Sequence, residues 1–154
     1  MIRTLYVTAI VGAVALGAPA FAADASFAFK TAYRDVTADP DGIWAADAFA
    51  DGKASVFEYQ LHSGGADLLV SQIWNEDCAS STCPTRLVKI ESGRRTVLVD
   101  DMMRQVIPPN DPRFANQAKS GPQAEYAQNP FRLSADGKTL INGDFKFELT
   151  GGKP

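Results

Sequence analysis

The only histidine of the chain, His62, is the first residue whose type could carry acid–base chemistry. It follows a strand-like run and precedes Ser63-Gly64-Gly65, a sequence typical of a hairpin tip. Ser-His-Asp catalysis would need a nucleophile and an orienting acid beside it, and the sequence has no Gly-x-Ser-x-Gly elbow. We therefore interpret His62 as a solvated turn residue and expect that the protein is not an enzyme.

Four aspartates, Asp39, Asp41, Asp47 and Asp51, raise the question of a calcium site. Asp39-Pro40-Asp41-Gly42 lacks the ligand spacing and the terminal Glu of an EF-hand loop, so we interpret these aspartates as turn residues. A carboxylate pair for glycoside hydrolysis stays open, because such pairs meet in space rather than in sequence. No Gly-rich phosphate loop is present. We expect neither a metal nor a cofactor.

Two cysteines stand close together in Cys78-Ala-Ser-Ser-Thr-Cys83. In an oxidising compartment they predict a disulfide that closes a tight loop and contributes about 2 kcal/mol. A redox site is the sharper alternative, but four intervening residues do not make the Cys-x-x-Cys motif of thioredoxin-like proteins. Zinc binding would need a second thiol pair or more histidines than His62.

The N-terminus has the order of features of a secretory signal peptide. Arg3 is followed by an uncharged stretch from Leu5 to Gly17, and Ala20 and Ala22 are the small residues that a signal peptidase reads. The apolar stretch is short for a transmembrane helix. We predict a signal peptide over residues 1–22 and a periplasmic or secreted protein without membrane insertion after cleavage.

Removal of residues 1–22 from the 154-residue chain leaves 132 residues, enough for one domain over residues 23–154. Arg3 is the only charge lost, so 14 basic residues face 18 acidic ones and the net charge is −4. This balance argues against nucleic acid as a partner and favours a basic partner.

Alternating apolar residues are the dominant pattern of this domain. Phe145, Phe147 and Leu149 alternate with charged residues, and turn sequences such as Asn142-Gly143 separate one such run from the next. The pattern predicts antiparallel strands near residues 25–34, 43–49, 54–61, 67–74, 85–91, 94–100, 130–134, 138–142 and 144–150. Two Ala-Asp-Gly-Lys tetrapeptides, at 50 and 135, are interpreted as hairpin turns.

The predicted fold class is all-β, a small antiparallel barrel or sandwich of about eight strands, and of the two we favour the barrel. Residues 102–130 break the alternation with five prolines and form a crossover, whose role the sequence leaves open. Asp111-Pro112 is a fair helix start, which allows a short helix over residues 112–119.

The segment Glu91-Ser92-Gly93-Arg94-Arg95-Thr96 lies between two predicted strands and should project as a hairpin. It partly resembles the Ser-Gly-x-x-Tyr loop of periplasmic lysozyme inhibitors, which are small exported β-barrel proteins. Ser92 and Gly93 match, and Thr96 stands where that family has Tyr. The resemblance implies a loop that enters a lysozyme cleft and binds the catalytic acids there, with Ser92, Gly93, Arg94, Arg95 and Thr96 as the partner-binding residues.

The residues of this turn support the same function without the family. A muramidase cleft presents carboxyl groups, to which Arg94 and Arg95 would donate charge-assisted hydrogen bonds and Ser92 a hydroxyl bond. An acidic protein is also attracted to a basic lysozyme. We expect an inhibitor of a lysozyme or endogenous peptidoglycan hydrolase. A sugar- or small-molecule-binding module that uses exposed Trp44 or Trp74 is the alternative, and an envelope enzyme is a third class.

Overall fold

The computed structural model describes residues 23–63, 65–79, 81–108, 111 and 131–149. The predicted signal peptide and the predicted helix over 112–119 lie outside these residues. Strands dominate the described chain, and its one helix there is the 3-10 helix η1 (Ala46–Phe49). No helix of this part of the chain is long and apolar enough to cross a membrane.

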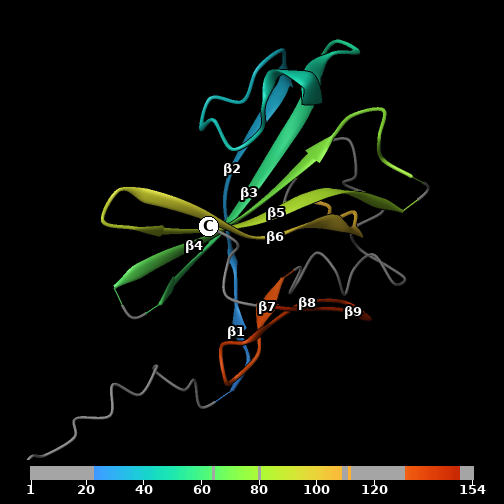
Figure 1. The fold of residues 1–154 in the computed structure, drawn as a ribbon. Coiled ribbons are helices and arrows are strands. Elements are labelled where there is room, and N and C mark those ends of the chain that lie inside the picture. Colours follow the sequence, from blue (N-terminus) through green and yellow to red (C-terminus); the bar gives the residue numbers. More distant parts are fainter. Residues whose placement is uncertain (1–22, 64, 80, 109–110, 112–130, 150–154) are drawn as a thin grey trace, which may run out of the picture.

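The strands form two antiparallel sheets, which confirms the predicted all-β class (Figure 1). The smaller sheet has the order β1-β7-β8-β9, and the larger one has the order β2-β3-β4-β5-β6. The bounds are β1 (Ala25–Ser26), β2 (Ala28–Val36), β3 (Ala54–Ser63), β4 (Ala66–Trp74), β5 (Thr82–Glu91), β6 (Arg94–Arg104), β7 (Arg132–Leu133), β8 (Thr139–Asn142) and β9 (Phe145–Glu148).

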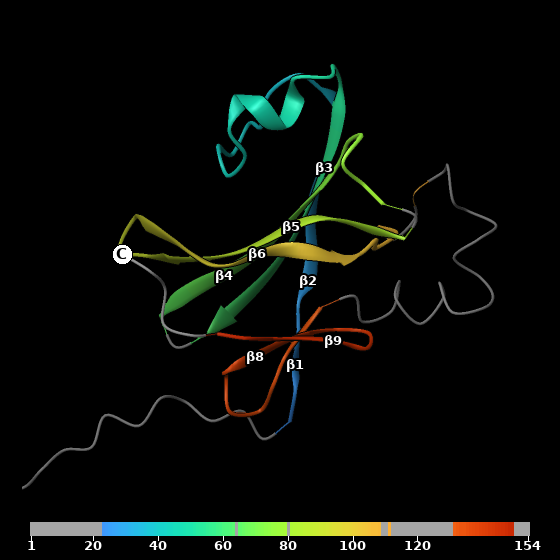
Figure 2. The same ribbon diagram turned by 45° about the vertical axis from the view of Figure 1, so that its right-hand side comes forward.

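Both sheets are open, so the structure is a sandwich and not the barrel that the sequence analysis favours. The smaller sheet covers one face of the larger sheet, and η1 with its flanking loop covers part of the other face (Figures 1 and 2). The chain passes from the smaller to the larger sheet at Phe27, whose N–H donates to Phe131 O at 2.9 Å. The predicted strand 25–34 is therefore two strands in different sheets.

Strand β3 shows why the sheet is buried on both faces. Phe57 and Tyr59 point into the core between the two sheets, where they pack with residues such as Leu87 and Phe131. Val56, which directly precedes Phe57, faces the other side of the sheet, because successive side chains of a strand alternate. There it packs in a second core whose buried members are Trp44, Phe49, Ala54, Val56 and Ile73.

The predicted strand 43–49 is wrong, because this segment contains η1. The Asp39 carboxylate accepts the N–H groups of Ile43 at 2.6 Å and Trp44 at 2.9 Å, which turns the chain before it can extend. Trp44 and Phe49 then both face the second core although their separation does not fit the period of a strand.

Several local predictions are confirmed. Cys78 and Cys83 form the disulfide. The turn sequences at 63–66, 91–94 and 142–145 close three hairpins. One boundary differs from the prediction: strand β6 continues to Arg104, so the crossover predicted from residue 102 begins later. Asp111, the predicted helix start, is buried and pairs with Arg34 Nη1 at 2.6 Å.

Candidate functional site

The predicted partner-binding turn is the tip of the β5–β6 hairpin, which reaches away from the rest of the larger sheet (Figures 1 and 2). Glu91 and Arg94 are paired, so Ser92 and Gly93 form a two-residue loop. Both have positive φ, 50° for Ser92 and 76° for Gly93. Positive φ at both central residues is the type I′ turn, whose twist matches that of the flanking strands. The turn is therefore a regular, preorganised element.

Exposure at this turn agrees with a binding role. Ser92, Gly93, Arg94 and Arg95 are exposed, and Thr96 is partly buried. Arg94 forms no ion pair with any residue that the structure describes. Its guanidinium and the Ser92 hydroxyl are therefore donors presented at the tip of the hairpin.

Arg95 differs from Arg94, because it already has a partner within the chain. Its Nη1 donates to the backbone carbonyl oxygen of Asp41. This bond joins the base of the turn to the loop that precedes η1. The two neighbouring arginines thus differ: Arg94 presents its guanidinium to solvent, and Arg95 links the hairpin to the loop before η1.

Asp41 also belongs to a charged cluster that the sequence analysis misses. Lys30 Nζ lies 2.8 Å from Glu58 Oε2 and 3.0 Å from Asp41 Oδ2, and the Tyr33 hydroxyl donates to Asp41 Oδ2 at 3.1 Å. Glu58 is fully buried. A charged residue in an alternating strand such as β3 typically faces solvent. The one sequence signal for the burial of Glu58 is the loop around Trp44, whose apolar residues indicate that it covers the sheet.

Burial raises the pKa of Glu58 to about 7, although its bond to Lys30 opposes the change. The pKa of Asp41 is lowered, first by its hydrogen bond with Glu58 and then by Lys30, against the effect of its own burial. Near pH 7 the buried Glu58 carboxyl is therefore partly protonated, because its pKa is about 7, and the Lys30 ammonium contacts both carboxyl groups. The cluster pins the loop to the sheet.

The other sequence-level candidates do not join this cluster. His62 contacts the Asp67 side chain, and 78% of its own side chain is exposed, so it is solvated as predicted. It lies in the last part of β3, opposite Asp67 of β4, and not in the turn itself. The Asp39 carboxylate accepts the N–H groups of Ile43 and Trp44 in the loop before η1. Within the described chain no group of three or more His, Cys, Asp or Glu side chains could hold a metal ion.

Neither tryptophan forms an open sugar-stacking surface. Trp44 is 7% exposed, the Arg86 guanidinium lies 4.4 Å from its ring centroid, and its Nε1 donates to Ser71 Oγ at 2.9 Å. Trp74 is partly buried, stacks edge-on against Phe57 at 4.6 Å and donates to Gln72. The binding-module alternative uses an exposed Trp44 or Trp74, and the structure shows Trp44 buried and Trp74 only partly exposed.

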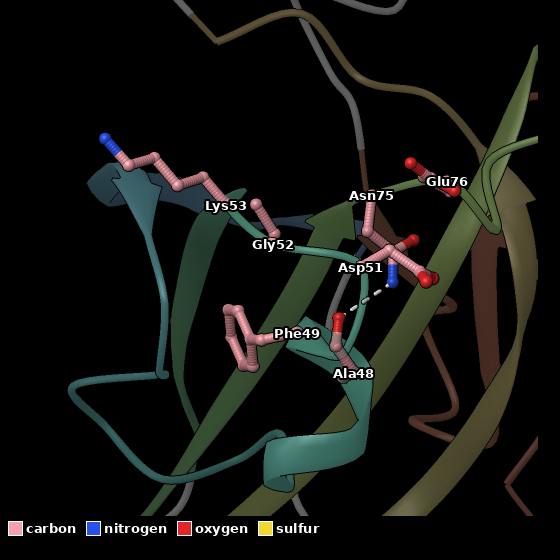
Figure 3. A pocket seen from close by; sticks show the side chains of 8 residues that line it. Ala48, Phe49, Asp51, Gly52, Lys53, Asn75 and Glu76 are labelled. Atoms are coloured by element: carbon pink, nitrogen blue, oxygen red, sulfur yellow. Dashed lines mark hydrogen bonds between the residues drawn. The ribbon is translucent and has the colours of Figure 1, made fainter.

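A hollow lies beside η1 in the described part of the chain (Figure 3). Its volume is about 40 Å³, far below the several hundred Å³ of a typical ligand pocket. Two of the residues that line it are hydrogen-bonded to each other: Asn75 Nδ2 donates to Ala48 O at 3.0 Å. The lining residues are Ala48, Phe49, Asp51, Gly52, Lys53, Ala54, Asn75 and Glu76.

No protein-family model, curated protein or solved structure matches the chain.

Proposed function

We propose that the protein is a periplasmic or secreted, non-catalytic inhibitor of a lysozyme or endogenous peptidoglycan hydrolase. One observation carries the proposal: the type I′ turn of the β5–β6 hairpin presents Ser92 and Arg94 to solvent. Arg94 has no ion-pair partner among the described residues, so binding a carboxylate would break no internal salt bridge.

The chemistry of a muramidase cleft complements this turn. The cleft is concave and contains carboxyl groups, and a protruding hairpin can reach them where a flat surface cannot. Arg94 would bind a carboxylate through charge-assisted hydrogen bonds, and Ser92 would add a hydroxyl donor. The turn already has the regular type I′ geometry of a two-residue hairpin, and a loop that is preorganised for binding loses less conformational entropy on association.

Arg95 supports the turn rather than entering the cleft. Its bond to the Asp41 carbonyl ties the hairpin to the loop, which the Glu58 cluster ties to the sheet. The net charge of −4 after residue 22 favours encounter with a basic enzyme, while the local positive charge of Arg94 favours the orientation in which the turn faces the acids.

The test is a titration of purified protein against a panel of lysozymes and envelope peptidoglycan hydrolases, with cell-wall lysis as the readout. We expect one enzyme of the panel to lose activity at a near-equimolar ratio, with unchanged inhibition when Lys138 on another hairpin is replaced by Ala. Full activity of every enzyme at a large excess of the protein would contradict the proposal.

A further inference from the structure

Strand β6 forms one edge of the larger sheet, whose order ends at β5-β6. No described strand pairs with its outer side in that sheet. Val97, at the middle of β6, is 45% exposed and is one of two large apolar residues exposed in the described chain. Around it the sequence reads Arg94-Arg95-Thr96-Val97-Leu98-Val99-Asp100-Asp101, basic at the start and acidic at the end.

The hairpin determines which backbone groups of β6 point outward. A two-residue turn closes on a pair that exchanges both hydrogen bonds, here Glu91 and Arg94, so the N–H and C=O groups of Arg95 and Val97 point away from β5. A register shift between Leu87 and Val88 then inserts Leu98 as an extra residue in β6. Beyond this bulge, Asp100 is the next residue with an outward backbone.

The same three residues also share a face of the sheet. Arg95 pairs with Ile90, Val97 with Val88 and Asp100 with Arg86, three positions of β5 that alternate onto one face. Without the bulge, Arg95 and Asp100 would lie on opposite faces. A two-fold axis perpendicular to a sheet places residues of the same face opposite each other, so β6 meets this requirement for antiparallel pairing with itself.

We propose that two copies of this chain associate through antiparallel pairing of their β6 edges. Val97 lies opposite Val97 of the second copy on the two-fold axis. Arg95 lies opposite the second copy's Asp100, and Arg94 opposite its Asp101, so each ion pair occurs twice. The two five-stranded sheets become one continuous sheet of ten strands.

Charge decides both the partner and the register. Charged residues normally protect an edge strand from pairing, because an approaching strand would bring like charges together or remove water from the charged groups. Here the antiparallel self-pairing brings opposite charges together, and opposite charges facing each other across strands are stabilising. Sliding the strands by one pair in either direction would place Arg95 or Asp100 opposite Val97 and remove the ion pairs. The second copy therefore fits this edge in one register.

The existing contacts of these residues are compatible with the pairing. Arg95 uses one guanidinium N–H for the Asp41 carbonyl, which leaves other donors. Asp100 binds Arg86 Nη2 through Oδ2 at 3.0 Å, and the Asp100 side chain is 53% exposed. The pairing does not rest on the proposed inhibitor function, but it covers Arg94 and so would compete with a target enzyme.

Sedimentation equilibrium of the purified chain tests the pairing. We expect a concentration-dependent dimer and at least about a tenfold loss of its association constant for Val97→Lys, which places two like charges at the axis. Phe29→Lys changes the other exposed apolar residue, on β2, and should leave the association constant unchanged. A monomer at every concentration, or equal loss in both variants, would overturn the proposal.

A charge exchange makes the test specific for the register. Arg95→Asp and Asp100→Arg should each be monomeric, because each places like charges opposite each other twice. Their equimolar mixture should form a heterodimer, since one chain then carries two acidic and the other two basic residues at the facing positions. If single variants still dimerise, or if folded variants fail to associate on mixing, the register is wrong.

Discussion

Arg95 and Asp41 are joined by a hydrogen bond from the guanidinium to the backbone carbonyl oxygen, across 54 positions of sequence. The bond connects the β5–β6 turn to the loop before η1. The side chain of the same Asp41 binds Lys30 and accepts from Tyr33. Asp41 thus connects the charged cluster of Lys30 and Glu58 to the β5–β6 hairpin.

Glu58 makes stability depend on pH. Its pKa is about 7 in the folded protein and lower when unfolded, so its stabilising contribution is complete below the unfolded value of about 4.5 and is lost as pH rises through about 7. Two to three pKa units correspond to about 3 kcal/mol. Urea unfolding of wild type should show a loss of this order between about pH 4.5 and about pH 8, and Glu58→Gln should show much less.

Glu76→Gln is the matched control, because it is the same substitution at an exposed carboxylate, at the edge of the hollow beside η1. It should retain the wild-type pH dependence. If Glu58→Gln lost as much stability across this range as wild type, Glu58 would not be the titrating group.

The Trp44–Arg86 contact should contribute to the attachment of the loop. A cation over a partly desolvated indole is worth about 0.5–2 kcal/mol, and the ring centroid lies 4.4 Å from the guanidinium. A double-mutant cycle with Trp44→Leu and Arg86→Ala should give a coupling energy in that range from urea unfolding. Trp44→Leu combined with Arg104→Ala is the control, since Arg104 lies over Phe145 instead. Additive effects in the Trp44–Arg86 cycle would show that the ring and the cation do not stabilise each other.

Export and oxidation can be tested together by intact mass of protein from the envelope fraction. Cleavage after Ala22 should start the chain at Ala23, and alkylation should label neither Cys78 nor Cys83 until a reductant is added. Reduction should lower the free energy of unfolding by about 2 kcal/mol, since the closed loop is short. Residues 1–22 retained in the envelope protein, or two thiols that react without reductant, would each refute one part of the prediction.

Local sequence signals predict the hairpins of this fold well. Gly93 and Gly143, which have positive φ, belong to turn sequences that are recognisable in the chain, and alternation identifies the strands on either side. The same signals fail where tertiary packing decides. The division of 25–34 at Phe27 depends on which sheet each half joins. The helix at 46–49 depends on the bend that Asp39 imposes at Ile43 and Trp44 and on packing in the second core.

The candidate site was predictable only in part for the same reason. Ser92 and Gly93 are found by their own turn chemistry. The difference between Arg94 and Arg95 depends on the Asp41 carbonyl, which approaches from far along the chain. The raised pKa of Glu58 likewise requires the loop that buries it, and a polar residue in an alternating strand gives no sign of such a cover.

Whether the β5–β6 turn enters a hydrolase cleft is decided by the inhibition constants of Arg94→Ala and Lys138→Ala against an enzyme that the wild-type protein inhibits. If Arg94 forms a buried charged hydrogen bond, its removal should weaken inhibition by about 2–5 kcal/mol, and the further change Arg95→Ala should weaken it again through loss of the brace. Lys138→Ala should change the constant little, because it removes the same charge from another hairpin. Unchanged inhibition by the folded Arg94→Ala/Arg95→Ala protein would contradict the claim.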